Sequence, residues 1–107
     1  MDDNNEPLRI TVQHPRLDAA IAPSFREEIR TVAGNMPDRV LLDLTGVEFI
    51  DSTGLGVLVA LLKQTGPGGR IAVIGARAPV LRLFQMTRLD SLFRLCASEA
   101  DARDALG

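Results

Sequence analysis

A carboxylate and two hydroxyls stand side by side at Asp51, Ser52 and Thr53, between an apolar run of strand length and an apolar run of helical length. The N-terminus of a helix leaves backbone N–H groups without intrahelical partners and carries about half a positive elementary charge. It therefore suits a capping side chain or a phosphate group. The residue types leave two roles open for Ser52 and Thr53: they cap the helix, or they accept a phosphate from another protein.

Two glycines, Gly54 and Gly56, follow the hydroxyls in the first turns of the predicted helix. Each weakens a helix by roughly 1 kcal/mol relative to alanine. Glycine at such a place usually marks the close approach of another backbone or of a partner. We therefore predict that something packs closely against the start of this helix.

No self-contained catalytic chemistry fits these residues. A serine between a strand and a helix is the geometry of a hydrolase nucleophile, but Gly-x-Ser-x-Gly is absent around Ser52, and the one histidine, His14, precedes Pro15 at the end of a predicted strand. The phosphate-binding pattern Gly-x-x-x-x-Gly-Lys-Ser/Thr does not occur. Cys96 is the single cysteine and the carboxylates lack metal-loop spacing, so we predict no disulfide, no metal, no cofactor and no enzymatic activity.

Charge and hydropathy argue against two classes of partner. The 12 basic and 14 acidic residues are well mixed, tryptophan and tyrosine are absent, and no basic cluster is interleaved with aromatic residues, which argues against nucleic acid. The apolar runs are shorter than the ~20 residues that span a bilayer, and the segment from Met1 to Glu6 is acidic where a signal peptide is basic. We therefore expect a cytoplasmic protein that binds neither nucleic acid nor membrane.

The pattern of apolar residues predicts strands that alternate with helices. Strands are predicted at 8–13, 16–18, 40–44, 70–75 and 92–95, and helices at 22–33, from Ser52 to about 64, at 78–86, and at 99–106 with Ser98 as its N-cap. This alternation indicates an α/β fold with mostly parallel inner strands. The length of 107 residues predicts one domain, with residues 1–7 as a flexible N-terminal tail.

The helix after Ser52 is apolar nearly all round, which leaves two interpretations. Such helices are usually buried, one face on the sheet and the other against a neighbouring helix. Alternatively, part of Leu55, Val59 or Leu62 stays exposed as a docking patch beside Ser52. The solvent accessibility of these three side chains separates the two interpretations.

The chain resembles the STAS domain, in its single-domain form as a bacterial anti-sigma factor antagonist, from about Leu8 to Leu106. Four pieces carry the resemblance, of which the third is highly specific: Arg16-Leu17-Asp18-Ala19-Ala20 with Ala22-Pro23, Val40-Leu41-Leu42-Asp43-Leu44, Phe49-Ile50-Asp51-Ser52-Thr53-Gly54-Leu55-Gly56-Val57, and Val80-Leu81-Arg82-Leu83-Phe84-Gln85-Met86-Thr87. Two positions depart from the family pattern. Pro15-Arg16 precedes Leu17-Asp18 where a glycine is common, and Ile21 stands where a threonine often provides the N-cap of the first helix.

The resemblance implies a four- to five-stranded mixed β-sheet with about four α-helices packed mainly on one face. It also implies phosphorylation of Ser52, with Thr53 as the second choice. The implied partner surface consists of Asp18, Asp51, Ser52, Thr53, Gly54, Leu55 and Gly56, in which the two aspartates are the acidic residues expected around the phosphoacceptor.

The resemblance further implies a partner-switching function. The unphosphorylated protein binds an anti-sigma factor that is also a serine/threonine kinase of the histidine-kinase-like ATPase fold, and a sigma factor is released. ATP and Mg²⁺ belong to that kinase, and a PP2C-type phosphatase removes the phosphate. The alternative is a STAS scaffold subunit of a transport or lipid-trafficking complex without a phospho-switch, against which the intact Asp-Ser-Thr-Gly-Leu-Gly motif argues.

Overall fold

The computed structural model describes residues 7–33, 38–66 and 68–107. Apart from Pro7, the predicted N-terminal tail lies outside the described residues, as does segment 34–37, which follows the helix predicted at 22–33. The main sheet has four strands in the order β1-β3-β5-β6, formed by β1 (Leu8–Thr11), β3 (Arg39–Asp43), β5 (Arg70–Ile74) and β6 (Arg94–Leu95). Every pairing described is parallel, where the resemblance implied a mixed sheet.

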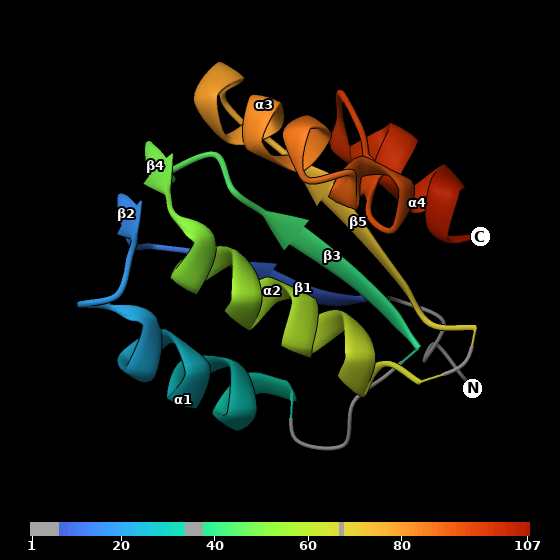
Figure 1. Cartoon of the computed structure of the whole chain (residues 1–107). Coiled ribbons are helices and arrows are strands. Elements are labelled where there is room, and N and C mark those ends of the chain that lie inside the picture. The colour runs from blue at the N-terminus through green and yellow to red at the C-terminus, as the bar shows by residue number, and fades with distance from the viewer. Residues whose placement is uncertain (1–6, 34–37, 67) are drawn as a thin grey trace.

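Helices cover both faces of this sheet (Figure 1). The four predicted helices are present, with a 3₁₀ turn before the last strand: α1 (Ala22–Ala33), α2 (Ser52–Gln64), α3 (Ala78–Met86), η1 (Leu89–Ser91) and α4 (Glu99–Leu106). The first three share one core with one face of the strands, whereas α4 packs on the opposite face. The α/β class and the predicted grouping of helices mainly on one face are therefore confirmed.

Alternation along the central strands explains how both faces are filled. Val40 and Leu42 of β3 belong to the core shared with α1, α2 and α3, while Leu41 between them packs with Ala102 and Leu106 of α4. Successive side chains of a strand point to opposite faces. Because both faces are covered, β3 and β5 carry continuous apolar runs, 40–42 and 71–74, without the polar alternation of a half-exposed strand.

A separate two-stranded ladder corrects the sequence interpretation of the chain just before Ser52. The helix does not follow the central strand directly, because β4 (Phe49–Ile50) intervenes and pairs in parallel with β2 (Arg16–Leu17) outside the main sheet. β2 follows β1 and β4 follows β3, so the two adjacent strands of the main sheet each continue into the small ladder after an irregular connection. This ladder places the starts of α1 and α2 next to each other (Figure 1).

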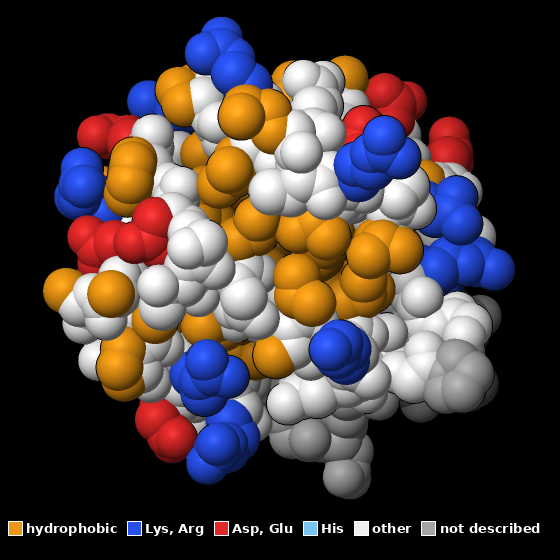
Figure 2. All heavy atoms as spheres, viewed as in Figure 1, with side chains coloured by type: hydrophobic (Ala, Val, Ile, Leu, Met, Phe, Trp, Pro, Cys, Tyr) orange, Lys and Arg blue, Asp and Glu red, His pale blue; other side chains and the backbone are white. Residues whose placement is uncertain are grey.

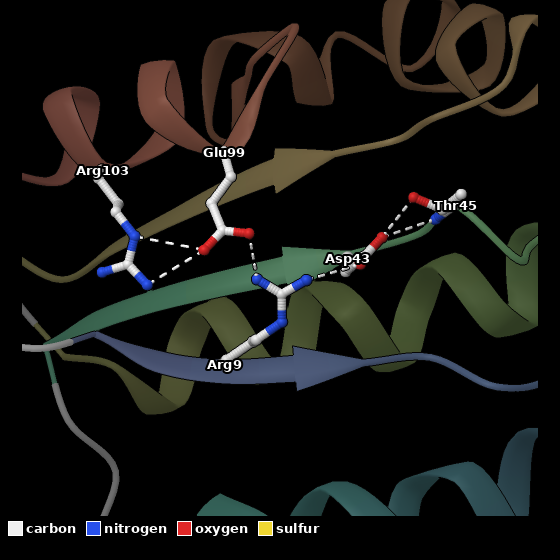
Figure 3. Close-up of polar contacts among 5 residues, drawn as sticks. All are labelled: Arg9, Asp43, Thr45, Glu99 and Arg103. Carbon is white, nitrogen blue, oxygen red and sulfur yellow. Dashed lines mark hydrogen bonds and ion pairs between the residues drawn. The ribbon is translucent and has the colours of Figure 1, made fainter.

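A network of charged side chains attaches α4 to the sheet (Figure 3). Arg9 of β1 donates to Asp43 of β3 at 2.9 Å and to Glu99 of α4 at 2.6 Å, and Arg103 contacts Glu99 at 3.1 Å. Burial alone raises the pKa of Asp43, but hydrogen bonds from Thr45 and the charge of Arg9 outweigh it, so the pKa of that carboxyl is lowered. Hydrogen bonds from Arg9 and Arg103 likewise lower the pKa of Glu99.

Candidate functional site

Ser52 is the first residue of α2, and its side chain is exposed together with that of Thr53. The N-cap of the helix is Asp51, whose Oδ1 accepts a hydrogen bond from the backbone N–H of Gly54 at 3.0 Å. Among the described residues, neither hydroxyl has a hydrogen-bond partner. The carboxylate therefore does the capping, and both hydroxyls face solvent.

The second predicted acidic residue, Asp18, lies on the neighbouring loop. Leu17 and Ile50 are register partners in the small ladder, and the N–H of Asp51 donates to the carbonyl of Leu17 at 3.1 Å. Asp18 and Asp51 thus leave the same ends of two adjacent parallel strands. The structure therefore places the backbones of these two aspartates, which the resemblance grouped around Ser52, at the ends of paired strands.

Asp18 also compensates for the missing threonine before the first helix. Its Oδ1 accepts hydrogen bonds from the backbone N–H groups of Ala20 at 3.1 Å and Ile21 at 3.3 Å, and its main-chain carbonyl accepts from Ala22 at 2.9 Å. The start of α1 is therefore held by a carboxylate from the preceding turn. Asp18 in turn meets the Nε of Arg16 at 3.4 Å.

The two glycines of the motif behave differently. A Cβ on Gly54 would lie 2.2 Å from the carbonyl oxygen of Leu17, so the predicted close approach is the packing of α2 on β2. A Cβ on Gly56 would meet nothing within 4 Å. Gly56 lies one turn beyond Ser52 on the same side of the helix, so it leaves open space next to the hydroxyl.

The predicted surface role of Leu55 is not supported by its position, because its side chain is 5% exposed and belongs to the main core. Leu55 follows Gly54 onto the sheet side of the helix, where Leu58 also packs. Val59 and Leu62 are half-buried. The buried interpretation is thus correct for Leu55, and the predicted docking patch is limited to Val59 and Leu62.

Other candidate groups do not form a second centre. The Nε2 of His14 lies 2.7 Å from Glu28, and its ring meets Phe25 edge to face at 6.1 Å. Burial and the nearby carboxylate of Asp101 raise the pKa of the Cys96 thiol, which disfavours the reactive thiolate. Within 7–33, 38–66 and 68–107, no three His, Cys, Asp or Glu residues are grouped to hold a metal ion, and no helix is long and apolar enough to cross a membrane.

The fold and the motif correspond to a known family. The STAS domain family matches residues 2–102, and the chain belongs to this family. Its members of this type are regulatory proteins, so the prediction that the chain is not an enzyme is confirmed by the family and its relatives.

Two relatives and one structural neighbour are similar to the chain. The chain is 30% identical to the anti-sigma-F factor antagonist RsfB of Mycobacterium tuberculosis over 86 residues. This alignment covers 80% of this chain and 70% of the relative. The crystal structure of an anti-sigma factor antagonist from Mycobacterium paratuberculosis is 28% identical, with a TM-score of 0.83 over 98% of this chain and 89% of that chain. The phosphorylated form of the Bacillus cell fate determinant SpoIIAA is 18% identical, with a TM-score of 0.66 over 96% of this chain and 95% of that chain, a likeness in fold alone.

Sequence reasoning missed two contacts that shape the site. The guanidinium of Arg16 lies over the ring of Phe49, 4.3 Å from its centroid, across the small ladder. The second contact is the close packing of Gly54 against the backbone of Leu17. The glycine itself signalled a close approach, but only the pairing of β2 with β4 identifies what approaches.

Proposed function

We propose that this protein is an anti-sigma factor antagonist controlled by phosphorylation of Ser52. The unphosphorylated form binds an anti-sigma factor that is also a serine kinase, and the bound anti-sigma factor releases its sigma factor. The observation that carries the proposal is the exposed Ser52 hydroxyl at the start of α2, unused in capping because Asp51 takes that role. The names of the relatives support the same function.

The local geometry favours a phosphate that changes the surface without unfolding the helix. A phosphate adds a charge of about −1.5 to −2, which the N-terminus of a helix tolerates. The same charge is added beside Asp51 and near the loop of Asp18, which makes a concentrated negative patch. The switch then works by repulsion and steric blockage at the partner surface.

The space above Gly56 supports close contact with a kinase in the unphosphorylated state. In the described residues nothing lies within 4 Å of a Cβ built on Gly56, and half-buried Val59 continues the same side of the helix. A partner can therefore approach the backbone of α2 and reach the hydroxyl. Thr53 is exposed as well and is the second-choice acceptor.

The remaining components follow from this function. ATP and Mg²⁺ are bound by the partner, a kinase of the histidine-kinase-like ATPase fold, and this protein needs no cofactor of its own. A PP2C-type phosphatase returns the phosphorylated form to the active state. The cytoplasm, where sigma factors meet RNA polymerase, is the compartment in which the switch operates.

Partner binding by matched variants tests the proposal. The Ser52→Ala protein serves as bait to recover the kinase, and the affinity of that kinase is then measured by calorimetry for wild type, Ser52→Ala, Ser52→Asp and Thr53→Asp. We expect Ser52→Ala to bind as wild type does without ATP and to resist ATP, whereas Ser52→Asp binds at least about tenfold more weakly. Thr53→Asp, with the same charge one residue on, has the smaller effect.

Equal binding by wild type and Ser52→Asp contradicts the switch. Recovery of a transport or lipid-trafficking complex in place of a kinase, with Ser52 unmodified in every growth condition, favours the scaffold alternative.

A further inference from the structure

A hollow of about 160 Å³ opens between β4 and α3, a few residues from Ser52. Its lining residues are Phe49, Ile50, Pro79, Arg82, Leu83 and Met86. Phe49 is 38% exposed and Met86 is 74% exposed, so two large apolar side chains are presented to solvent at one place. Figure 2 shows hydrophobic side chains gathered between α2 and the α3 half of the molecule. Half-buried Leu83 of the lining also packs against the core. We call the hollow the β4–α3 groove.

The charge of the β4–α3 groove is positive. Arg82 is the one charged residue in its lining, and no carboxylate lines it. In the described part of the chain, Arg82 has no ion-pair or hydrogen-bond partner. A second cation, Arg16 of the paired strand β2, lies over the ring of Phe49 and also meets Asp18 at 3.4 Å.

A second arginine-flanked hollow provides an internal comparison. It lies between α1 and α2, has a volume of about 80 Å³, and is lined in part by Arg26 and Arg30. Arg30 pairs with Glu27 at 3.2 Å, so one of its two cations is compensated within the chain. The β4–α3 groove is larger, presents more exposed apolar surface and keeps its lining cation unpaired.

We propose that the β4–α3 groove binds a protein segment with a large apolar side chain flanked by carboxylates. The apolar side chain covers Phe49 and Met86, and the carboxylates meet Arg82 and Arg16. This inference rests on the proposed function in one respect, namely that the segment belongs to the partner that faces Ser52. The groove prefers negative charge, whereas the aspartates beside Ser52 prefer positive charge, so the two contacts together fix the orientation of the partner.

Peptide titrations followed by amide NMR on the full ¹⁵N-labelled chain test this proposal. The probe is a short capped peptide with Leu-Phe between glutamates, and the matched control peptide has lysines in place of the glutamates. The variants are Arg82→Glu, which reverses the groove's charge, and Met86→Gln, which removes an exposed apolar contact. Arg26→Glu is the control, because it makes the same charge reversal at the α1–α2 hollow.

We expect saturable shifts of β4 and α3 amides with the acidic peptide, roughly tenfold weaker binding for Arg82→Glu, a smaller loss for Met86→Gln, and no change for Arg26→Glu. Ser52→Asp binds the acidic peptide as wild type does, which separates this site from the phospho-switch. The proposal is overturned by equal binding of the lysine peptide, by shifts centred on α1 and α2, or by no saturable shift. Failure of the groove proposal in this experiment does not change what the Ser52 variants show about the phospho-switch. Equally, an unmodified Ser52 does not change what the peptide titration shows about the groove.

Discussion

The carboxylates of this protein serve different purposes on the α4 side of the sheet and at the start of α2. On the α4 side, Arg9 contacts both Asp43 and Glu99, so charges from three elements neutralise one another and hold those elements together (Figure 3). At the start of α2, Asp51 and Asp18 accept hydrogen bonds from backbone N–H groups of their own loops. There the carboxylates bind backbone groups, and in the described residues Arg16, 3.4 Å from Asp18, is the one cation paired with either of them.

The contrast separates the contacts that hold the fold together from the site that we propose acts as a switch. Cross-element ion pairs fix α4, and none of their groups is part of the STAS motif around Ser52. At the motif, Arg16 is the nearby cation, at 3.4 Å from Asp18, and it is also engaged with the ring of Phe49. A phosphate on Ser52 therefore adds negative charge beside Asp51, which has no ion-pair partner among the described residues, while the caps hold the backbone.

The largest effect is expected where the backbone of α2 touches β2. Gly54→Ala places a methyl group against the carbonyl of Leu17, which is backbone and cannot rotate away, so we expect a loss of about 2 kcal/mol in the free energy of unfolding. Gly56→Ala is the matched control and should gain about 0.5–1 kcal/mol, because its Cβ enters open space and alanine favours the helix. Urea denaturation measures both. Equal effects at the two glycines contradict the packing described.

A smaller effect is expected at the cap. Asp51→Ala removes the acceptor of the Gly54 N–H and should cost about 1 kcal/mol, whereas Asp51→Asn keeps a capping oxygen and should stay close to wild type. The pair also tests the role of charge. In the phosphorylated protein, Asp51→Asn should recover part of the lost affinity for the partner, since one repelling charge is gone. An asparagine variant as unstable as the alanine variant shows that Asp51 is not the cap.

The smallest effect concerns the scaffold side. The folded-state pKa values of Asp43 and Glu99 are below their ordinary values of 3.8 and 4.5, so the network stabilises the fold above those values and loses this contribution as pH falls through the lowered ones. Arg9→Met should therefore be less stable than wild type at neutral pH, by less than the cap variant. The difference should shrink as the pH of the urea titration falls below about 4. A difference that persists in strong acid contradicts the network.

The helices could be predicted from local patterns in the sequence, whereas the contacts between distant parts of the chain could not. The predicted start of the last helix at Ser98 is confirmed, because its hydroxyl accepts from the N–H of Asp101, three residues away. The two-residue strand β4 was not predicted, because its stability comes from pairing with β2, more than thirty residues earlier. The contact between Arg9 and Glu99 joins residues near opposite ends of the chain, so no local sequence pattern predicts it.

The same distinction applies to the site. Ser52 was identifiable because the motif around it is specific and continuous, and the capping preference of aspartate is local. Burial of Leu55 was one of two interpretations that the sequence left open, since the apolar pattern of α2 runs nearly all round the helix and does not show which side meets the sheet. The β4–α3 groove depends on two segments that only the fold brings together.

Mass spectrometry of the peptide that contains Ser52 shows directly whether this serine is the phosphoacceptor. The full chain and its Ser52→Ala variant are incubated with ATP and an extract of the cells that produce the protein, and then digested with trypsin. The peptide from Val40 to Lys63 contains three hydroxyls, Thr45, Ser52 and Thr53, which fragmentation distinguishes. The account predicts phosphate on Ser52 in the wild type and none on this peptide in the variant. Phosphate on Thr45 or Thr53 with Ser52 unmodified, or undiminished phosphate in the variant, contradicts it.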